Sequence, residues 1–125
     1  MDDDTTSSRH ISIWIDASPD AVYAFASDPA ELPRWAAGLA DPSLSDAVVD
    51  FVPKNDFGVL DHVVRLPSGE AVYNPLRVIP GGVGGVGCEV LFSVRRRDGM
   101  TTAEFDADAA AVAADLDALR QLLEN

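Results

Sequence analysis

Three polar residues with complementary chemistry lie on the two strands of one predicted β-hairpin. His62 precedes the turn sequence Pro67–Glu70, and Tyr73 and Arg77 follow it. A two-residue turn and a four-residue loop give the same cross-strand register, which places these three side chains on one face of the hairpin. An imidazole, a phenol and a guanidinium in an apolar pocket could polarise a carbonyl group or bind a carboxylate.

The two faces of this hairpin have similar apolar character. In the same register, the opposite face carries Asp61, Arg65 and Asn74. We expect the face with the imidazole to line a cavity, because a few polar groups in a mostly apolar pocket are the usual form of a ligand site. The alternative places that face in solvent, and a one-residue change of register would separate its three polar residues.

Other motifs that could carry chemistry do not have the structural context that their chemistry requires. The segment Gly82–Gly87 matches G-x-G-x-x-G, but the strand-like run 88–94 follows it where a dinucleotide site needs a helix. Asp61 and His62 are adjacent on a predicted strand, so their side chains point to opposite faces and cannot pair in a catalytic triad. Two histidines and one cysteine, without a paired ligand motif, do not favour a metal site. We therefore expect no cofactor and no metal, and we expect Cys88 to be buried and unreactive.

The composition is that of one globular domain. The chain has 125 residues, and no apolar run approaches the ~18 residues of a membrane span. The formal net charge of −12 disfavours binding to nucleic acid or to an anionic membrane surface. Three consecutive arginines at 95–97 are the local exception, and we interpret them as a solvated strand edge. One cysteine leaves no internal disulfide, so a reducing cytoplasm is the expected compartment.

The predicted elements run in the order strand, two short helices, several strands and one long helix. The opening strand at 9–15 leads into a helix that Ser18 caps and Pro19 begins. A second short helix carries Leu32 and Trp35 on one side. Turn-rich connections between the later strand-like runs favour antiparallel hairpins. These runs cover 47–52, 57–66, 71–79 and 88–96.

The last helix has the clearest pattern. Thr101 and Glu104 have the spacing of a capping box, in which each side chain bonds to the other residue's backbone N–H. Frequent alanine raises the helix propensity and lets the helix approach a sheet closely. This pattern predicts an amphipathic helix of roughly six turns. Its apolar stripe consists of Phe105, Ala109, Val112, Leu116, Leu119 and Leu123.

The first third of the chain carries a family resemblance. The strand Arg9–Ile15, the connection Asp16–Pro19, the helical run Ala21–Phe25 and the segment Asp28–Trp35 resemble the opening of START-like, or SRPBCC, proteins. This superfamily includes the Bet v 1-like proteins and the polyketide cyclase/dehydrase group. The resemblance implies an α+β helix-grip fold, with two short helices after the first strand and a curved antiparallel sheet wrapped around a long C-terminal helix. It also implies a cavity for an apolar ligand.

This resemblance sets the expected domain organisation and function. Residues 1–8 are expected to be a disordered acidic lead-in, and residues 9–125 a single START-like domain. We expect a cytoplasmic protein that binds a small hydrophobic or aromatic molecule between the sheet and the last helix. The expected ligand-binding residues are Trp35, His62, Tyr73 and Arg77, although ordinary core packing is the alternative for Trp35.

Two alternatives belong to other functional classes. The resemblance to the polyketide cyclase/dehydrase group implies an enzyme in which His62 is the general acid or base, while Tyr73 and Arg77 polarise a carbonyl. Some relatives act as protein-interaction modules that resemble co-chaperones, and the acidic surface here could bind a basic partner. If the chain self-associates, a twofold homodimer is the expected arrangement.

Overall fold

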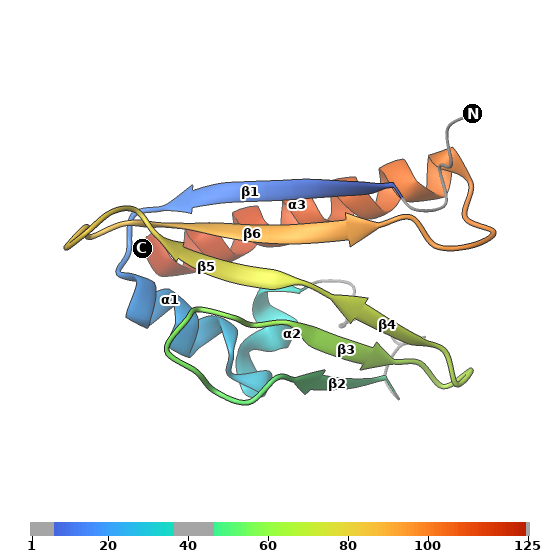
Figure 1. Cartoon of the computed structure of the whole chain (residues 1–125), viewed down its shortest axis with the longest axis horizontal. Coiled ribbons are helices and arrows are strands. Elements are labelled where there is room, and N and C mark those ends of the chain that lie inside the picture. Colours follow the sequence, from blue (N-terminus) through green and yellow to red (C-terminus); the bar gives the residue numbers. More distant parts are fainter. Residues whose placement is uncertain (1–6, 37–46, 125) are drawn as a thin grey trace.

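A computed structural model describes residues 7–36 and 47–124 (Figure 1). Residues 1–6 of the expected lead-in lie outside these ranges, and the first strand begins at Ser8. The elements are β1 (Ser8–Ile15), α1 (Pro19–Ala26), the 3₁₀-helix η2 (Pro29–Glu31), α2 (Leu32–Trp35), β2 (Val48–Phe51), β3 (His62–Arg65), β4 (Ala71–Asn74), β5 (Leu76–Pro80), β6 (Cys88–Arg95) and α3 (Thr102–Glu124).

The described strands form two three-stranded antiparallel sheets that meet at Pro75. One sheet has the order β1–β6–β5 and the other has the order β2–β3–β4. Pro75 separates β4 from β5 and lacks the N–H that would continue the ladder. Leu60 N donates a backbone hydrogen bond to Leu76 O at 2.8 Å, so the segment before β3 is bonded to β5. The sheets therefore curve as one surface, and α3 runs along β1 and β6 (Figure 1). This is the predicted α+β helix-grip fold.

The core lies between this curved surface and the helices. Four residues of the predicted stripe on α3 are buried, and the other two are half-buried, so the amphipathic pattern is confirmed. Leu116 and Leu119 pack in one cluster with buried residues of the sheet and of the short helices. Across the described ranges, no helix combines the length and the apolar character that a membrane span needs.

Both predicted helix starts are confirmed by their hydrogen bonds. Ala21 N donates to Ser18 Oγ at 3.1 Å, and Pro19 is the first residue of α1. At the start of α3, Thr101 N donates to Glu104 Oε1 at 2.8 Å, and Glu104 N donates to Thr101 Oγ1 at 3.1 Å. These reciprocal bonds satisfy two backbone donors that the first turn of the helix would leave free.

The predicted register of the β3–β4 hairpin is wrong by one residue. The connecting loop has three residues, 67–69, in which Gly69 N and Leu66 O bond at 2.9 Å and Gly69 adopts a φ of +94°. Glycine at this last position allows a three-residue loop, which the sequence prediction did not consider. His62 consequently pairs with Asn74, and Val63 pairs with Tyr73. Because a one-residue shift exchanges the faces of a strand, Tyr73 and His62 lie on opposite faces.

The three arginines at 95–97 lie at the end of β6 and in the segment after it. β6 is the middle strand of its sheet, and Arg95 pairs with Ser8 of β1. On its other side, pairing with β5 ends at Phe92, and Ser93 N donates to Pro75 O at 3.1 Å. Arg95 therefore lies where β4 diverges from β6. Arg95 is exposed at this end of β6, as expected for a solvated strand edge, and it also borders the space beside β4.

Candidate functional site

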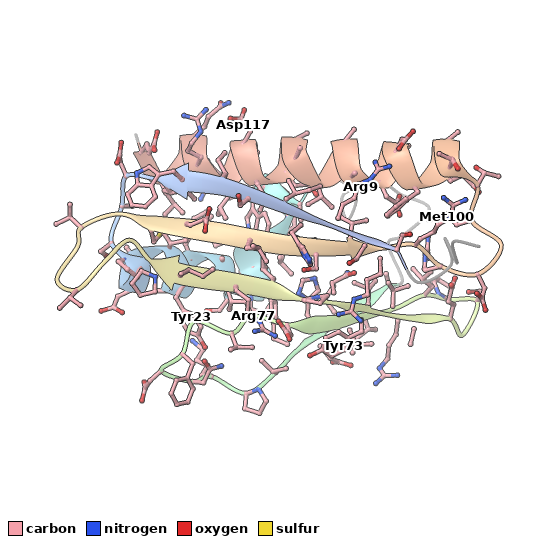
Figure 2. All side chains as sticks on the ribbon, turned by 45° about the horizontal axis from the view of Figure 1, so that its top comes forward. Arg9, Tyr23, Tyr73, Arg77, Met100 and Asp117 are labelled. Carbon is pink, nitrogen blue, oxygen red and sulfur yellow. The ribbon has the colours of Figure 1, made fainter. Side chains whose placement is uncertain are left out.

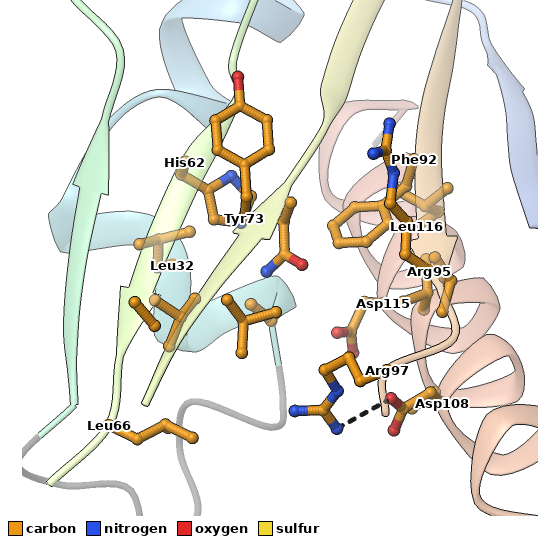
Figure 3. Close-up of a pocket in the computed structure, with 18 of the residues that line it drawn as sticks. Leu32, His62, Leu66, Tyr73, Phe92, Arg95, Arg97, Asp108, Asp115 and Leu116 are labelled. Atoms are coloured by element: carbon orange, nitrogen blue, oxygen red, sulfur yellow. Dashed lines mark ion pairs between the residues drawn. The ribbon is translucent and has the colours of Figure 1, made fainter. Parts of the chain in front are cut away.

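A pocket of about 500 Å³ lies between the β3–β4 hairpin, the end of β6 and the helices α2 and α3 (Figure 3). This volume falls within the range of roughly 300–1,000 Å³ that is typical of small-molecule sites. Most of its wall is apolar, so an apolar molecule could lose much of its contact with water there. The apolar lining residues are Leu32, Trp35, Ala36, Val64, Leu66, Ala71, Val72, Phe92, Val94, Ala111, Val112 and Leu116.

His62 is the buried titratable residue in this wall. Only 8% of the residue is exposed, and the ring lies between Phe51 and Phe92, at centroid distances of 5.2 and 6.1 Å. His62 Nδ1 lies 3.0 Å from the carbonyl oxygen of Leu60. Since a carbonyl can only accept, Nδ1 carries the proton and the neutral ring keeps its lone pair on Nε2. His62 can therefore accept a hydrogen bond or a proton.

Burial lowers the pKa of His62 below its ordinary value of 6.5. The hydrogen bond to Leu60 and the negative charge of Asp61 oppose this shift without cancelling it. The unfolded chain therefore binds the proton more readily than the folded protein does. The stability that His62 contributes is complete above pH 6.5 and is lost as the pH falls from there towards the folded pKa.

We expect His62 to be neutral at pH 7, with its proton on Nδ1. Long-range ¹H–¹⁵N NMR spectra distinguish a protonated from an unprotonated ring nitrogen, and a His10→Gln variant assigns the signals of the other histidine. The unfolding free energy of the wild-type protein should decline below pH 6.5, and we expect this decline to be smaller in a His62→Gln variant. A doubly protonated His62 ring at pH 7 would contradict both expectations.

The other polar group of this hairpin is centred on Asp61, on the opposite face of the strand. Arg77 donates twice to the Asp61 carboxylate, from Nε and from a terminal nitrogen, both at 2.8 Å. Tyr73 Oη donates to Asp61 at 2.7 Å, and Leu76 N donates at 2.9 Å. Asp61 is only 3% exposed. Its oxygens accept four hydrogen bonds, so the buried charge is fully compensated.

These bonds hold Asp61 ionised. Its pKa is about 2, below the ordinary 3.8, chiefly because Arg77 donates to the carboxylate. Burial opposes the shift, while the bonds from Tyr73 and from the Leu76 backbone reinforce it. A carboxylate with so low a pKa and no unused acceptor position is a poor general base. We therefore assign this network to structure, since it joins β3 to the strands on both sides of Pro75.

The four predicted ligand-binding residues thus divide between two places. Trp35 and His62 lie in the pocket wall. Tyr73 also lines the pocket, but its hydroxyl is bonded to Asp61. Arg77 is outside the wall and is bonded to the same carboxylate. Figure 2 shows Tyr73 and Arg77 together over β4 and β5, away from α3. The predicted cluster of His62, Tyr73 and Arg77 is therefore not formed.

Trp35, which lines the pocket, carries an unusual polar group. The residue is 4% exposed, and its Nε1 is a buried donor that has no hydrogen-bond partner. It is the single such side-chain atom found within residues 7–36 and 47–124. A buried donor without an acceptor costs free energy. A ligand oxygen that reached this nitrogen would recover that cost.

Sequence reasoning missed four charged residues of the pocket wall. Arg95 and Arg97 come from the end of β6 and the segment after it, and Asp108 and Asp115 come from α3. Figure 3 shows the two arginines and the two aspartates on the side of the pocket opposite Leu66. The run of three arginines was the available signal, but only the path of β4 away from β6 places it beside a cavity. Within the described residues, no group of three His, Cys, Asp or Glu side chains could hold a metal ion.

The chain matches no protein-family model, and it matches no curated protein by sequence. Several solved structures share its fold. A conserved protein of unknown function from Enterococcus faecalis gives a TM-score of 0.60 at 15% identity, over 98% of this chain and 74% of that chain. Truncated norcoclaurine synthase from Thalictrum flavum gives 0.57 at 16% identity, over 98% and 97%. The protein XoxI from Bacillus cereus gives 0.52 at 14% identity, over 94% and 95%.

These similarities concern the fold. Norcoclaurine synthase has a Bet v 1-like fold, and the order of elements and the long C-terminal helix are consistent with the same helix-grip arrangement here. At such low identity, the activity of a neighbour does not transfer to this chain. The fold is one that can bind a ligand, and the chemistry of the site has to be argued from this chain's own residues.

Proposed function

We propose that this protein binds a small, largely apolar or aromatic molecule in the pocket between the β3–β4 hairpin and α3. The observation that carries the proposal is the pocket itself, a volume of about 500 Å³ with a mostly apolar wall and a few polar groups. The resemblance of the first third of the chain to SRPBCC proteins supports the same reading. We place this activity in the cytoplasm, where a single buried cysteine stays reduced.

His62 and Trp35 supply the polar contacts of the proposed complex. His62 Nε2 can accept a hydrogen bond from the ligand, and Trp35 Nε1 can donate one. A ligand with one hydroxyl and one carbonyl or ether oxygen would satisfy both groups. The rest of the binding free energy would come from apolar area removed from water.

A second candidate function is catalytic, and the state of His62 favours it. A buried, neutral imidazole with a free lone pair can act as a general base, a role that contributes roughly 10²–10⁴-fold to a rate. The carbonyl would need another polarising group, because Tyr73 and Arg77 are engaged by Asp61. Under this proposal, His62→Ala abolishes turnover of a bound carbonyl compound, whereas a simple binding protein retains most of its affinity.

Binding can be tested with N-phenyl-1-naphthylamine, a neutral fluorophore whose emission rises in apolar surroundings. Replacing Ala111 by tryptophan places an indole at the pocket wall from a position on α3 that is exposed. We expect the wild-type protein to bind the fluorophore, and we expect Ala111→Trp to weaken binding by about tenfold or more, since apolar contact area is lost.

The adjacent residue provides the matched control. Ala110 is also exposed on α3 but does not line the pocket, so Ala110→Trp should leave the affinity unchanged. Circular dichroism of both variants establishes that each is folded. Equal affinity of the two variants for the fluorophore, or no binding to the wild-type protein, would overturn the proposal.

A further inference from the structure

The charged residues at the pocket indicate the class of ligand. Apolar residues line the pocket from α2, β3, β4, β6 and α3, and its two arginines come from the end of β6 and from the segment after it. A bound molecule with an apolar body would therefore present its remaining end to guanidinium groups. This inference rests on the proposed binding function and specifies it further.

Of the four charged residues of the pocket wall, Arg95 is the one without a side-chain partner among the described residues. Its side chain lines the pocket where β4 diverges from β6, and it makes no ion pair or hydrogen bond with any side chain of the described residues. It lies near Tyr73, on whose hydroxyl its charge acts electrostatically. Arg95 is exposed, so its guanidinium can reach a ligand in the pocket without breaking an existing ion pair. A guanidinium has a planar array of donors that matches the two oxygens of a carboxylate.

Arg97 is a second guanidinium that can turn to a ligand. Its two ion pairs are long, 3.5 Å to Glu70 and 3.7 Å to Asp108, and all three side chains are about half exposed. Pairs of this kind in contact with water contribute little and exchange readily. Figure 3 shows Arg97 reaching from the β6 side of the pocket, with its ion pair to Asp108 as a dashed line.

The two acidic residues of the wall are already engaged. Asp108 pairs with Arg97, and Asp115 has an interaction of its own. A cationic ligand would therefore compete with existing interactions, whereas an anionic ligand would meet an unpaired guanidinium. Charge complementarity at this pocket favours the anion.

We propose that the ligand is an amphipathic carboxylate, whose apolar body fills the pocket and whose carboxylate binds Arg95, with Arg97 as a second donor. One molecule then satisfies both the apolar wall and the unpaired charge. Arg95 accordingly determines specificity for acids over neutral compounds of the same shape.

The test compares 2-naphthylacetate with 2-naphthylacetamide, which share an apolar body and differ in charge. Calorimetric titration at low salt should show the carboxylate binding about tenfold tighter to the wild-type protein, because charge-assisted hydrogen bonds are stronger than neutral ones. Arg95→Gln should bring the two affinities close to each other while the affinity for the amide stays the same. Arg95→Lys, which keeps the charge but loses the planar array of donors, should retain part of the preference.

The control is Arg65→Gln, which removes the same charge from an exposed position on β3 that does not line the pocket. This variant should keep the full preference for the carboxylate. If the wild-type protein binds both compounds equally, the carboxylate proposal is overturned while the binding function stands. If neither compound binds, both proposals fail. Tighter binding of 2-(2-naphthyl)ethylamine than of the carboxylate would assign the site to cations.

Discussion

Replacing Asp61 by asparagine is expected to lower the free energy of unfolding by about 3 kcal/mol. The substitution removes the negative charge and replaces one carboxylate oxygen, which accepts two of the four hydrogen bonds, by an NH₂ donor at a position that is 3% exposed. It also leaves the Arg77 guanidinium beside an amide that cannot neutralise it. Because Arg77 is itself 45% exposed and can turn to water, we expect a loss at the lower end of the range for a broken buried pair.

The pH dependence of this loss identifies its cause. The pKa of Asp61 is about 2 in the folded protein, against an ordinary 3.8, so its contribution is present above pH 3.8 and is lost as the pH falls towards 2. That contribution amounts to about 2 kcal/mol. The difference in unfolding free energy between wild type and Asp61→Asn should therefore shrink across this interval. Urea denaturation at a series of pH values measures it.

An exposed ion pair provides the matched control for this substitution. Asp50 pairs with Arg65 at 3.0 Å, and both side chains are more than half exposed. Asp50→Asn should therefore cost less than about 1 kcal/mol. A similar loss for the two variants, or a difference from wild type that does not change with pH, would refute the structural role assigned to Asp61.

Replacing Gly58 by alanine is expected to destabilise the protein by about 3 kcal/mol or more. Gly58 has a φ of +71°, a conformation that costs a residue with a side chain roughly 1–2 kcal/mol. A Cβ at this position would also overlap the carbonyl oxygen of Val78, a backbone atom that cannot turn aside. Gly58 O accepts a hydrogen bond from Val78 N at 2.8 Å. A movement of the backbone that removed the overlap would therefore break this hydrogen bond between the segment and β5.

Gly69 separates the two causes of this loss. It also has a positive φ, +94°, but a Cβ there would meet no atom within 4 Å. Gly69→Ala should therefore lose only the conformational part, about 1–2 kcal/mol. Thermal unfolding of both variants gives the comparison. Equal losses would show that the contact between Gly58 and Val78 does not constrain the chain.

The Gly58 and Asp61 variants also test how the chain positions His62. Gly58 and Asp61 fix the segment before β3 against β5, on either side of Leu60, whose carbonyl sets the His62 tautomer. A loose segment would allow the imidazole to turn within the pocket. The NMR signature of His62 in a partly stable Asp61 variant would then show both tautomers.

Local patterns of the sequence were sufficient for the helices and for the class of fold. Ser18 and Pro19 mark the start of α1, and Thr101 and Glu104 mark the start of α3. The apolar stripe of α3 has the spacing that burial requires. The strand predicted directly after the G-x-G-x-x-G match is present and begins at Cys88. Each of these features depends on residues within about one or two helical turns of each other, so neighbouring residues carry the information.

The composition of the site was decided by tertiary structure. A loop of three residues, rather than two or four, places Tyr73 and His62 on opposite faces of the hairpin. The turn sequence up to the glycine does not distinguish these loop lengths. The alternation of side chains has a period of two, so this single residue exchanged the partners of every group on the hairpin. Arg95 became a pocket residue because Pro75 turns β4 away from β6. The sequence by itself determined the helices and the class of fold. The tertiary structure divided the predicted strand 71–79 into β4 and β5 at Pro75, and the pairing of distant strands determined which side chains share the cavity.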